Sequence, residues 1–175
     1  MHILSTSRRL EHSSVKSVEH PSALRVAKEL RRRGVAGPFV EFESSTKTAA
    51  DAAAALACEV GAIASSLVFV LDESPIVIIK SGAFRVDLVE FALLAGGDVA
   101  RRASADEVRE ATGQPIGGVS PVGWPGELRV FIDDALAAYE QVWAACGTPN
   151  AVFATSYEEL RFVTSATPIS LNALR

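Results

Sequence analysis

The sequence has few of the residues from which metal sites and disulfide scaffolds are built. Its 2 cysteines, Cys58 and Cys146, lie far apart and neither belongs to a CxxC pair, so neither a disulfide framework nor a zinc motif is indicated. All 3 histidines, His2, His12 and His20, occur before the first predicted helix, in a stretch with no clear secondary-structure pattern. We therefore expect no metal ion, and two reduced, mostly buried thiols.

Long apolar runs and an excess of positive charge are also missing. The longest apolar stretches, 66–71 and 76–79, are far shorter than the roughly 18 residues that a membrane-spanning helix needs. The first residues mix charges and serines without the apolar centre of a secretory signal, so we expect a flexible arm over 1–19 and a cytoplasmic protein. A formal net charge of −4 argues against coating of long nucleic acids, so any RNA contact must be local.

What the chain does contain is a regular alternation of short helical and strand patterns. With 175 residues, of which 49% are hydrophobic, it suits one domain, which we place at 20–175. The apolar periodicity predicts helices over 22–33, 48–58, 85–94, 104–113 and 156–166, and strands over 38–43, 66–71, 75–80, 127–133, 141–146, 151–154 and 167–171. This order predicts a mixed-sheet α/β or α+β domain.

Two polar segments stand out between these elements. The first predicted helix ends in Arg31, Arg32 and Arg33, which indicate either a solvated helix end or a contact with phosphates. The loop 112–126 is dense in glycine and proline. Its glycines permit close backbone approach with exposed N–H groups while a proline restricts the turn, so it suits either ligand binding or an ordinary tight turn.

Four segments, in order, carry a resemblance to a known family. They are HPSALRVAKELRRRGV, STKTAADAAAALACEVGAIASSLVF, ATGQPIGGVSPVG and FIDDALAAYEQVWAACGTPNAVF. Together they resemble the YbaK/ProX family of prolyl-tRNA-synthetase-associated editing domains, from about residue 20 to residue 171. The most specific match is GGVSP, residues 117–121, which fits the GxxxP motif of that family.

The resemblance implies a single α/β domain whose mixed, barrel-like sheet is flanked by helices. It also implies a pocket for the acylated 3′ end of a tRNA, where the ester of a wrong amino acid is hydrolysed in trans, often alanine or cysteine on the tRNA for proline. No metal or organic cofactor is implied. The implied partners are tRNA and prolyl-tRNA synthetase, and homodimerisation is left open.

The resemblance also locates two departures from the family pattern. The family pattern IxKSLVF places a catalytic lysine where this chain has Ser65, and some members have a histidine where Trp124 stands. An ammonium offers three donors and a full charge, whereas a hydroxyl offers one neutral donor. Loss of one donor from an oxyanion site costs about 2.7–4 kcal/mol. Trp124 suits stacking on the terminal adenine, a pocket wall or a half-buried core position equally.

Site residues follow from the resemblance and from the chemistry of ester hydrolysis, which needs a positioned water and donors for the oxyanion. Lys47 and Lys80 are alternative sources of the missing charge, or else solvated surface lysines; Asp133 and Asp134 orient a water or cap the following helix. The predicted catalytic residues are Ser65, Lys47 and Asp133, and the predicted substrate-binding residues are Thr46, Gly117, Gly118, Val119, Ser120, Pro121, Trp124, Gly147 and Thr148.

Three functions are compatible with these residues. The first is an aminoacyl-tRNA deacylase, and the second is a catalytically weak relative that binds tRNA ends or a small amino-acid-like ligand, because the lysine is replaced. A generic serine esterase is the third, although the sequence has no GxSxG elbow and no histidine placed beside a serine within the fold.

Overall fold

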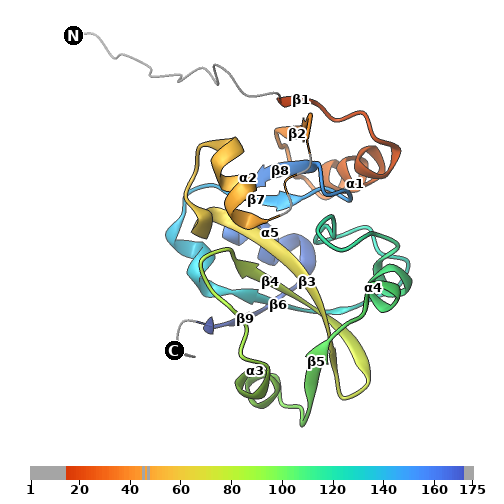
Figure 1. The fold of residues 1–175 in the computed structure, drawn as a ribbon, viewed down its shortest axis with the longest axis vertical. Helices are drawn as coiled ribbons and strands as arrows, with labels where there is room; N and C mark the ends of the chain where they lie inside the picture. The colour runs from red at the N-terminus through yellow and green to blue at the C-terminus, as the bar shows by residue number, and fades with distance from the viewer. Residues whose placement is uncertain (1–14, 45, 47, 172–175) are drawn as a thin grey trace, which may run out of the picture.

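The computed structural model describes residues 15–44, 46 and 48–171, and its framework is one mixed sheet (Figure 1). Within this part of the chain the sheet has 9 strands, in the order β1-β2-β8-β7-β3-β4-β6-β9, with β5 paired to β3. The strands are β1 (Val15–Ser17), β2 (Phe39–Phe42), β3 (Ile63–Leu71), β4 (Ser74–Ser81), β5 (Ala100–Arg102), β6 (Arg129–Asp133), β7 (Val142–Ala145), β8 (Ala151–Thr155) and β9 (Thr167–Ile169).

Helices cover both faces of this sheet, and most begin at a side-chain cap. The elements are α1 (Pro21–Arg32), α2 (Ala49–Leu56), α3 (Leu88–Leu94), α4 (Ala105–Thr112) and α5 (Tyr157–Thr164), with 3-10 turns η1 (Val60–Ala62) and η2 (Asp134–Ala138). Thr48 and Ser104 form capping boxes at the starts of α2 and α4. Each box satisfies amide groups that the first helical turn leaves without partners.

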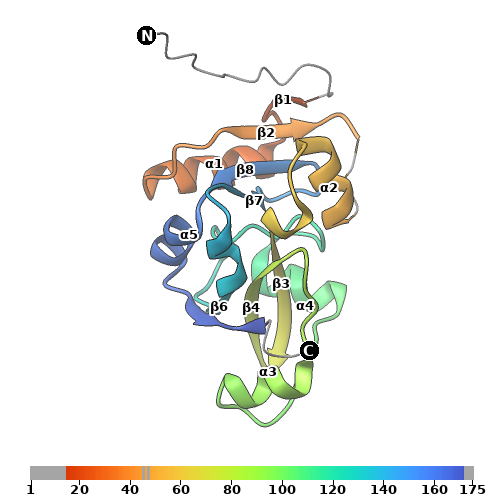
Figure 2. The same ribbon diagram turned by 90° about the vertical axis from the view of Figure 1, so that its left-hand side faces the viewer.

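The alternation of side chains along β3 and β4 separates the helices into two layers. One face carries Ala64, Val68, Val77 and Ile79, which share a core cluster with α1, α4 and α5. The other face packs against α3 through a cluster that includes Phe69 and Ile78, and against α2 through a second cluster that includes Ile63. Figure 2 shows α2 and α3 at opposite ends of the long β3–β4 pair.

The sheet is interrupted beside the middle of β3. Strand β7 pairs with β3 only at Ile63 and Ala64, and β5 pairs with it only at residues 69–71. Between these two contacts no described strand pairs with this side of β3, although the amide of Ala103 donates to the carbonyl of Val68 at 3.4 Å. A break in a ladder leaves backbone groups free for other partners.

The predicted fold class, a single α/β domain with a mixed sheet flanked by helices, is confirmed. Three local details differ from the prediction. Strand β1 lies inside the stretch 1–19 that we expected to be an arm and pairs with β2, and β5 was not predicted. Strand β3 begins at Ile63 rather than residue 66, because Ile63 and Ala64 pair with β7. No helix in the described part of the chain is long and apolar enough to cross a membrane.

Candidate functional site

A cavity of about 330 Å³ opens at the interruption of the sheet beside β3. Its lining comes from the start of α2, from β3 and β4, from the glycine-rich loop, and from β7, β8 and the turn between them. The polar side chains in this lining belong to Thr46, Thr48, Ser65, Ser66 and Lys80. The cavity therefore joins four segments that are far apart in the sequence.

Ser65 and Lys80 are direct cross-strand neighbours in this wall. The antiparallel register of β3 and β4 places Ser65 opposite Lys80 and Ser66 opposite Ile79. Side chains of directly opposed residues share one face of the sheet, with Cβ atoms about 4.5–5.5 Å apart. Ser65 is half-buried, and its hydroxyl makes no hydrogen bond to any described residue. A lysine thus lies beside the position where the resemblance had indicated a missing one.

Lys80 is held by two backbone carbonyls. Its Nζ donates to the carbonyl oxygen of Ser81 at 2.9 Å and to that of Phe84 at 2.6 Å. Burial lowers the pKa of Lys80 below its ordinary value, and the carboxylate of Asp133 acts in the opposite direction. The two carbonyls use two of the three hydrogens that an ammonium can donate.

Ser66 contributes its backbone amide to the cavity rather than its side chain. Its side chain is 7% exposed, and its hydroxyl has no hydrogen-bond partner among the described residues. The carbonyl of Val68 points away from β4, since it accepts from Ala103. Because backbone groups two residues apart in a strand point the same way, the Ser66 amide is directed into the interruption of the sheet.

The glycine-rich loop closes another side of the cavity, but only part of it faces inward. Gly117 and Val119 line the cavity, and no described residue accepts a hydrogen bond from either amide. Gly118 packs on the neighbouring turn instead, since an added Cβ would lie 2.5 Å from the backbone carbon of Thr148. Its amide donates to the carbonyl of Pro115 at 2.9 Å.

Ser120 and Pro121 do not line this cavity. The Ser120 amide donates to Oε1 of the buried Gln114 at 2.7 Å, and its hydroxyl bonds to the carbonyl of Val122. Ser120 therefore holds the loop together from within. Gln114 is the residue that sequence reasoning missed, and a glutamine between a helix-ending glycine and a proline is too ordinary a signal to have found it.

The turn after β7 supports the opposite rim. Thr46 donates through Oγ1 to the carbonyl of Pro149 at 3.3 Å, and both residues line the cavity. Gly147 has φ +88°, and a Cβ there would lie 2.8 Å from Cγ2 of Val26 in α1, so this glycine permits close packing. Thr148 is buried behind the rim, with no described partner for its hydroxyl.

Asp133 lies outside the cavity, at the end of β6. Its carboxylate is fully buried and accepts hydrogen bonds from the amides of Ser81 and Ala135, both at 3.1 Å. It therefore caps η2, which is one of the two roles left open by the sequence. Burial raises the pKa of Asp133, and the hydrogen bonds from the two backbone amides act against that rise.

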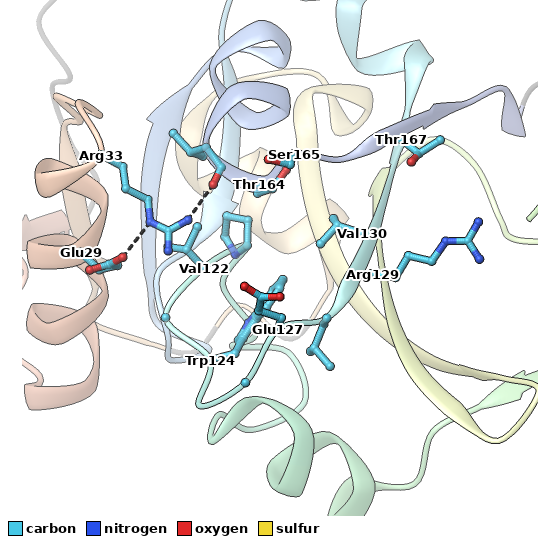
Figure 3. Close-up of a pocket in the computed structure, with 15 residues that line it drawn as sticks. Glu29, Arg33, Val122, Trp124, Glu127, Arg129, Val130, Thr164, Ser165 and Thr167 are labelled. Carbon is cyan, nitrogen blue, oxygen red and sulfur yellow. Dashed lines mark hydrogen bonds and ion pairs between the residues drawn. The ribbon is translucent and has the colours of Figure 1, made fainter.

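Trp124 and Pro121 belong to a different, more open cavity of about 750 Å³, which Figure 3 shows. The Trp124 indole is half-buried against the core and donates to the carbonyl of Ser120 at 3.0 Å. Both arginines of this cavity are engaged within the protein, whereas Glu127 has no described partner; Arg33 bonds to Glu29 and to the carbonyl of Val163 (Figure 3). Arg129 likewise donates to the carbonyl of Ala95. Its larger volume alone therefore does not make this cavity a better candidate for the functional site than the cavity beside β3.

The structure thus brings together Ser65, Thr46, Gly117 and Val119 of the predicted site. It places Asp133, Gly118, Ser120, Pro121, Trp124, Gly147 and Thr148 outside the cavity lining. Lys47 lies outside the described residues. In the described residues no group of three or more His, Cys, Asp or Glu side chains could hold a metal ion. The groups available to a ligand are hydroxyls, backbone amides and one ammonium, which suit a carbonyl or an oxyanion.

Comparison with known proteins identifies the family of the chain. A profile of the aminoacyl-tRNA editing domain family matches residues 43–163. The uncharacterized protein YwhH of Bacillus subtilis (strain 168) is 34% identical over 121 residues, which are 69% of this chain and 76% of YwhH. The proline–tRNA ligase of Bacillus cereus (strain AH187) is 32% identical over 73 residues, or 42% of this chain and 13% of the ligase.

A solved structure extends the similarity to the whole fold. The crystal structure of a proposed trans-editing enzyme for prolyl-tRNA synthetase is 43% identical and superposes with a TM-score of 0.82. The match covers 88% of this chain and 98% of that one. Because the family profile spans more than half of the chain, the chain belongs to the aminoacyl-tRNA editing domain family.

Proposed function

We propose that this protein hydrolyses mischarged aminoacyl-tRNA in trans, and that alanine or cysteine on the tRNA for proline is its substrate. The observation that carries the proposal is the cavity, in which Ser65, Lys80 and the Gly117–Val119 turn meet at an interrupted sheet. Family membership and the similarity to part of proline–tRNA ligase support the choice of tRNA. We place the activity in the cytoplasm, with prolyl-tRNA synthetase as a further partner.

The reaction that these groups can support is the attack of water on the ester carbonyl carbon. The bond between that carbon and the ribose oxygen breaks, and the proton from water ends on the ribose oxygen. The products are the free amino acid and a tRNA with a free terminal hydroxyl. An aminoacyl ester is already activated, so positioning of the water and donors for the oxyanion supply most of what the step needs.

The backbone amides at the interruption are the donors we assign to the oxyanion. The Ser66 amide is directed into this space, and the amides of Gly117 and Val119 have no described acceptor. Backbone donors of this kind are fixed before the substrate arrives, so they stabilise the developing charge without reorganisation. The Ser65 hydroxyl suits a hydrogen bond to the attacking water, because it has no competing partner among the described residues.

Discrimination between amino acids would follow from the volume of the cavity. Apolar side chains of Ile63, Leu67, Trp143 and Val152 limit the space, together with Ala49 and Ala52 on α2. A pocket that excludes by size separates substrates that differ by one methylene by about 10–200-fold. A small cavity therefore favours alanine over the larger correct amino acid.

The test is a deacylation assay on tRNA for proline that carries alanine, cysteine or proline. We expect the alanyl or cysteinyl ester to be hydrolysed well above the spontaneous rate, with the prolyl ester at least tenfold slower. Equal, spontaneous rates for all three esters would refute the proposal.

The replacement of the family lysine by Ser65 favours a second candidate, a binding protein with little turnover. On this account the cavity holds a tRNA end or a small amino-acid-like ligand, and the missing cation removes catalysis. Tight binding of uncharged tRNA by wild-type protein, with no hydrolysis until Ser65→Lys is introduced, would support this candidate over the first.

A further inference from the structure

We propose that Lys80, on β4, supplies the positive charge of the cavity and binds the carbonyl oxygen of the ester during hydrolysis. This inference rests on the proposed function, because it assigns a role within that reaction. Sequence reasoning treated Lys80 as one alternative source of charge, and it did not include the residue in the predicted site. Three features of the structure support this role: the register of β3 and β4, the lining of the cavity, and an ammonium hydrogen of Lys80 that has no described acceptor.

Lys80 and Ser65 occupy opposed positions in one wall of the cavity. Lys80 lies directly across the β3–β4 pair from Ser65, and both residues line the same cavity. Both project from the face that carries Leu67 and Ile78, since 65 and 67 alternate with core-facing Ala64 and Val68. A lysine side chain is long enough to span the distance between opposed positions on a strand pair.

Lys80 also gives the cavity its charge. Lys80 is the one charged side chain in the described lining of this cavity, where its neighbours are hydroxyls, alanines and larger apolar groups. A charge in a half-buried site interacts more strongly than one in bulk water, because the surroundings screen it less. An oxyanion formed beside Ser65 would therefore be stabilised by this ammonium.

The Lys80 ammonium is held in place by hydrogen bonds before any substrate binds. The ammonium donates two hydrogen bonds, to the carbonyls of Ser81 and Phe84. The backbone amide of Ser81 in turn donates a hydrogen bond to the carboxylate of Asp133. The third hydrogen of the ammonium has no acceptor among the described residues. Carbonyl acceptors hold the ammonium without neutralising it, whereas a direct ion pair would do so; no described carboxylate lies within 4.0 Å of Lys80.

The experiment compares single-turnover hydrolysis of alanyl-tRNA for proline by wild-type protein, Lys80→Met, and Lys80→Met combined with Ser65→Lys. We expect Lys80→Met to reduce the rate constant by about 10²–10³-fold, as for loss of an oxyanion donor. The added lysine at 65 is expected to recover at least tenfold, because it restores charge to the same wall but cannot restore the bonds to Ser81 and Phe84. Lys28→Met, an exposed change on α1, is the matched control and should leave the rate unchanged.

Each outcome decides a different claim. Wild-type hydrolysis that survives Lys80→Met within threefold overturns the role of Lys80 and leaves the proposed function standing. An inert wild-type protein that Ser65→Lys activates also overturns it, because Lys80 then does not replace the cation. If neither protein hydrolyses any ester, the proposed function fails and this inference fails with it.

Folding of the variants is checked by circular dichroism and thermal unfolding. If Lys80→Met loses its native spectrum, Lys80→Gln replaces it, because an amide retains donors for the two carbonyls but carries no charge. A loss of 10²–10³-fold in this variant, with unchanged binding of uncharged tRNA, supports a role in the reaction step. A rate within threefold of wild type overturns the role.

Discussion

Individual side chains around the cavity fall into those that face it and those that support its walls. Ser65 and Lys80 face it, whereas Gly118, Ser120 and Asp133 hold the surrounding backbone through packing and buried hydrogen bonds. Substitutions in these two sets of residues should have different effects. Changes in the first should alter the reaction, and changes in the second should alter stability first.

Gly118→Ala tests the supporting role of the glycine-rich loop. An added Cβ would lie 2.5 Å from the backbone carbon of Thr148, so loop and turn must move apart. We expect the free energy of unfolding to fall by about 1–3 kcal/mol, the usual cost of overpacking, in urea denaturation. Gly126→Ala is the control, because nothing lies within 4 Å of the added atom. Equal stability of the two variants would contradict the packing assigned to Gly118.

Cys146 tests the burial of the core beside the turn at Gly147. The thiol is fully buried next to the carbonyl of Ala23, and burial raises its pKa to about 12. Because the thiolate is the reactive form, we expect no reaction with a thiol reagent at pH 8 until the protein unfolds. Cys58 is only half-buried and provides the internal comparison. Rapid native-state labelling of Cys146, located by mass spectrometry, would contradict the packing described.

Short helices with strong caps position the rim of the cavity. Helix α2 starts from the capping box of Thr48 and Asp51, and Thr48 also lines the cavity. Helix α4 starts from an equivalent box of Ser104 and Glu107, which leads into the glycine-rich loop at its other end. The cap of α2 therefore lies at the cavity itself, whereas the cap of α4 lies at the far end of its helix from the glycine-rich loop.

Removal of these two helix caps should lower stability by a similar amount but affect hydrolysis differently. Thr48→Ala and Ser104→Ala each leave an amide without its acceptor, and we expect each to lower the free energy of unfolding by about 1 kcal/mol. Only Thr48→Ala should also slow ester hydrolysis, since only Thr48 lines the cavity. Equal rates of hydrolysis by the two variants would show that the start of α2 has no part in the reaction.

Glu107 should contribute to the loss of stability in acid. Hydrogen bonds from Arg101 and from the amide of Ser104 lower the pKa of Glu107 to about 2. A lowered pKa stabilises the native state above the unfolded value near 4.5, and this stability is lost as the pH falls toward 2. We expect Glu107→Gln to be less stable than wild type at pH 6, with the difference shrinking toward pH 2. A difference independent of pH would contradict this assignment.

Across the whole molecule, the site arises because the sheet is interrupted beside the middle of β3. Strand β3 changes partner from β7 to β5, and the residues between these contacts form one wall of the cavity. Strand β4 supplies the opposing lysine along the same wall. The site therefore depends on pairing between distant segments rather than on any local motif.

Sequence reasoning identified the elements with clear periodicity and missed those without it. The helices at α1, α2 and α4 were predictable from apolar spacing and caps, whereas β5 is three residues long, two of them arginine. The opposition of Ser65 and Lys80 depends on a two-residue turn at Asp72 and Glu73, both at positive φ. Such turns favour Asn, Asp or Gly at the first position and Gly at the second, so Glu73 weakens the signal of the register. Asp72 instead accepts bonds from the amides of Asp98 and Val99.

The charge of the whole molecule predicts a weak dependence of hydrolysis on salt. The net charge is −4, and Arg32 and Arg33 of the basic run bond to Glu29 while Arg31 lies over the Phe39 ring. The basic run at the end of α1 is thus engaged within the protein, and for a contact confined to the tRNA end we expect kcat/KM to fall less than tenfold between 50 and 200 mM salt. A fall of about 10³-fold or more, as for a protein with many phosphate contacts, would contradict a contact confined to the tRNA end.

The most direct measurement of the central claim, that the cavity beside β3 is where the ester is hydrolysed, fills each of the two cavities in turn. Ser65→Phe occupies the smaller cavity, and Thr167→Phe occupies the larger one next to Trp124. With alanyl-tRNA for proline in single-turnover assays, we predict that Ser65→Phe abolishes hydrolysis and Thr167→Phe leaves it unchanged, both proteins being folded. Hydrolysis that survives Ser65→Phe but is lost with Thr167→Phe would contradict the account.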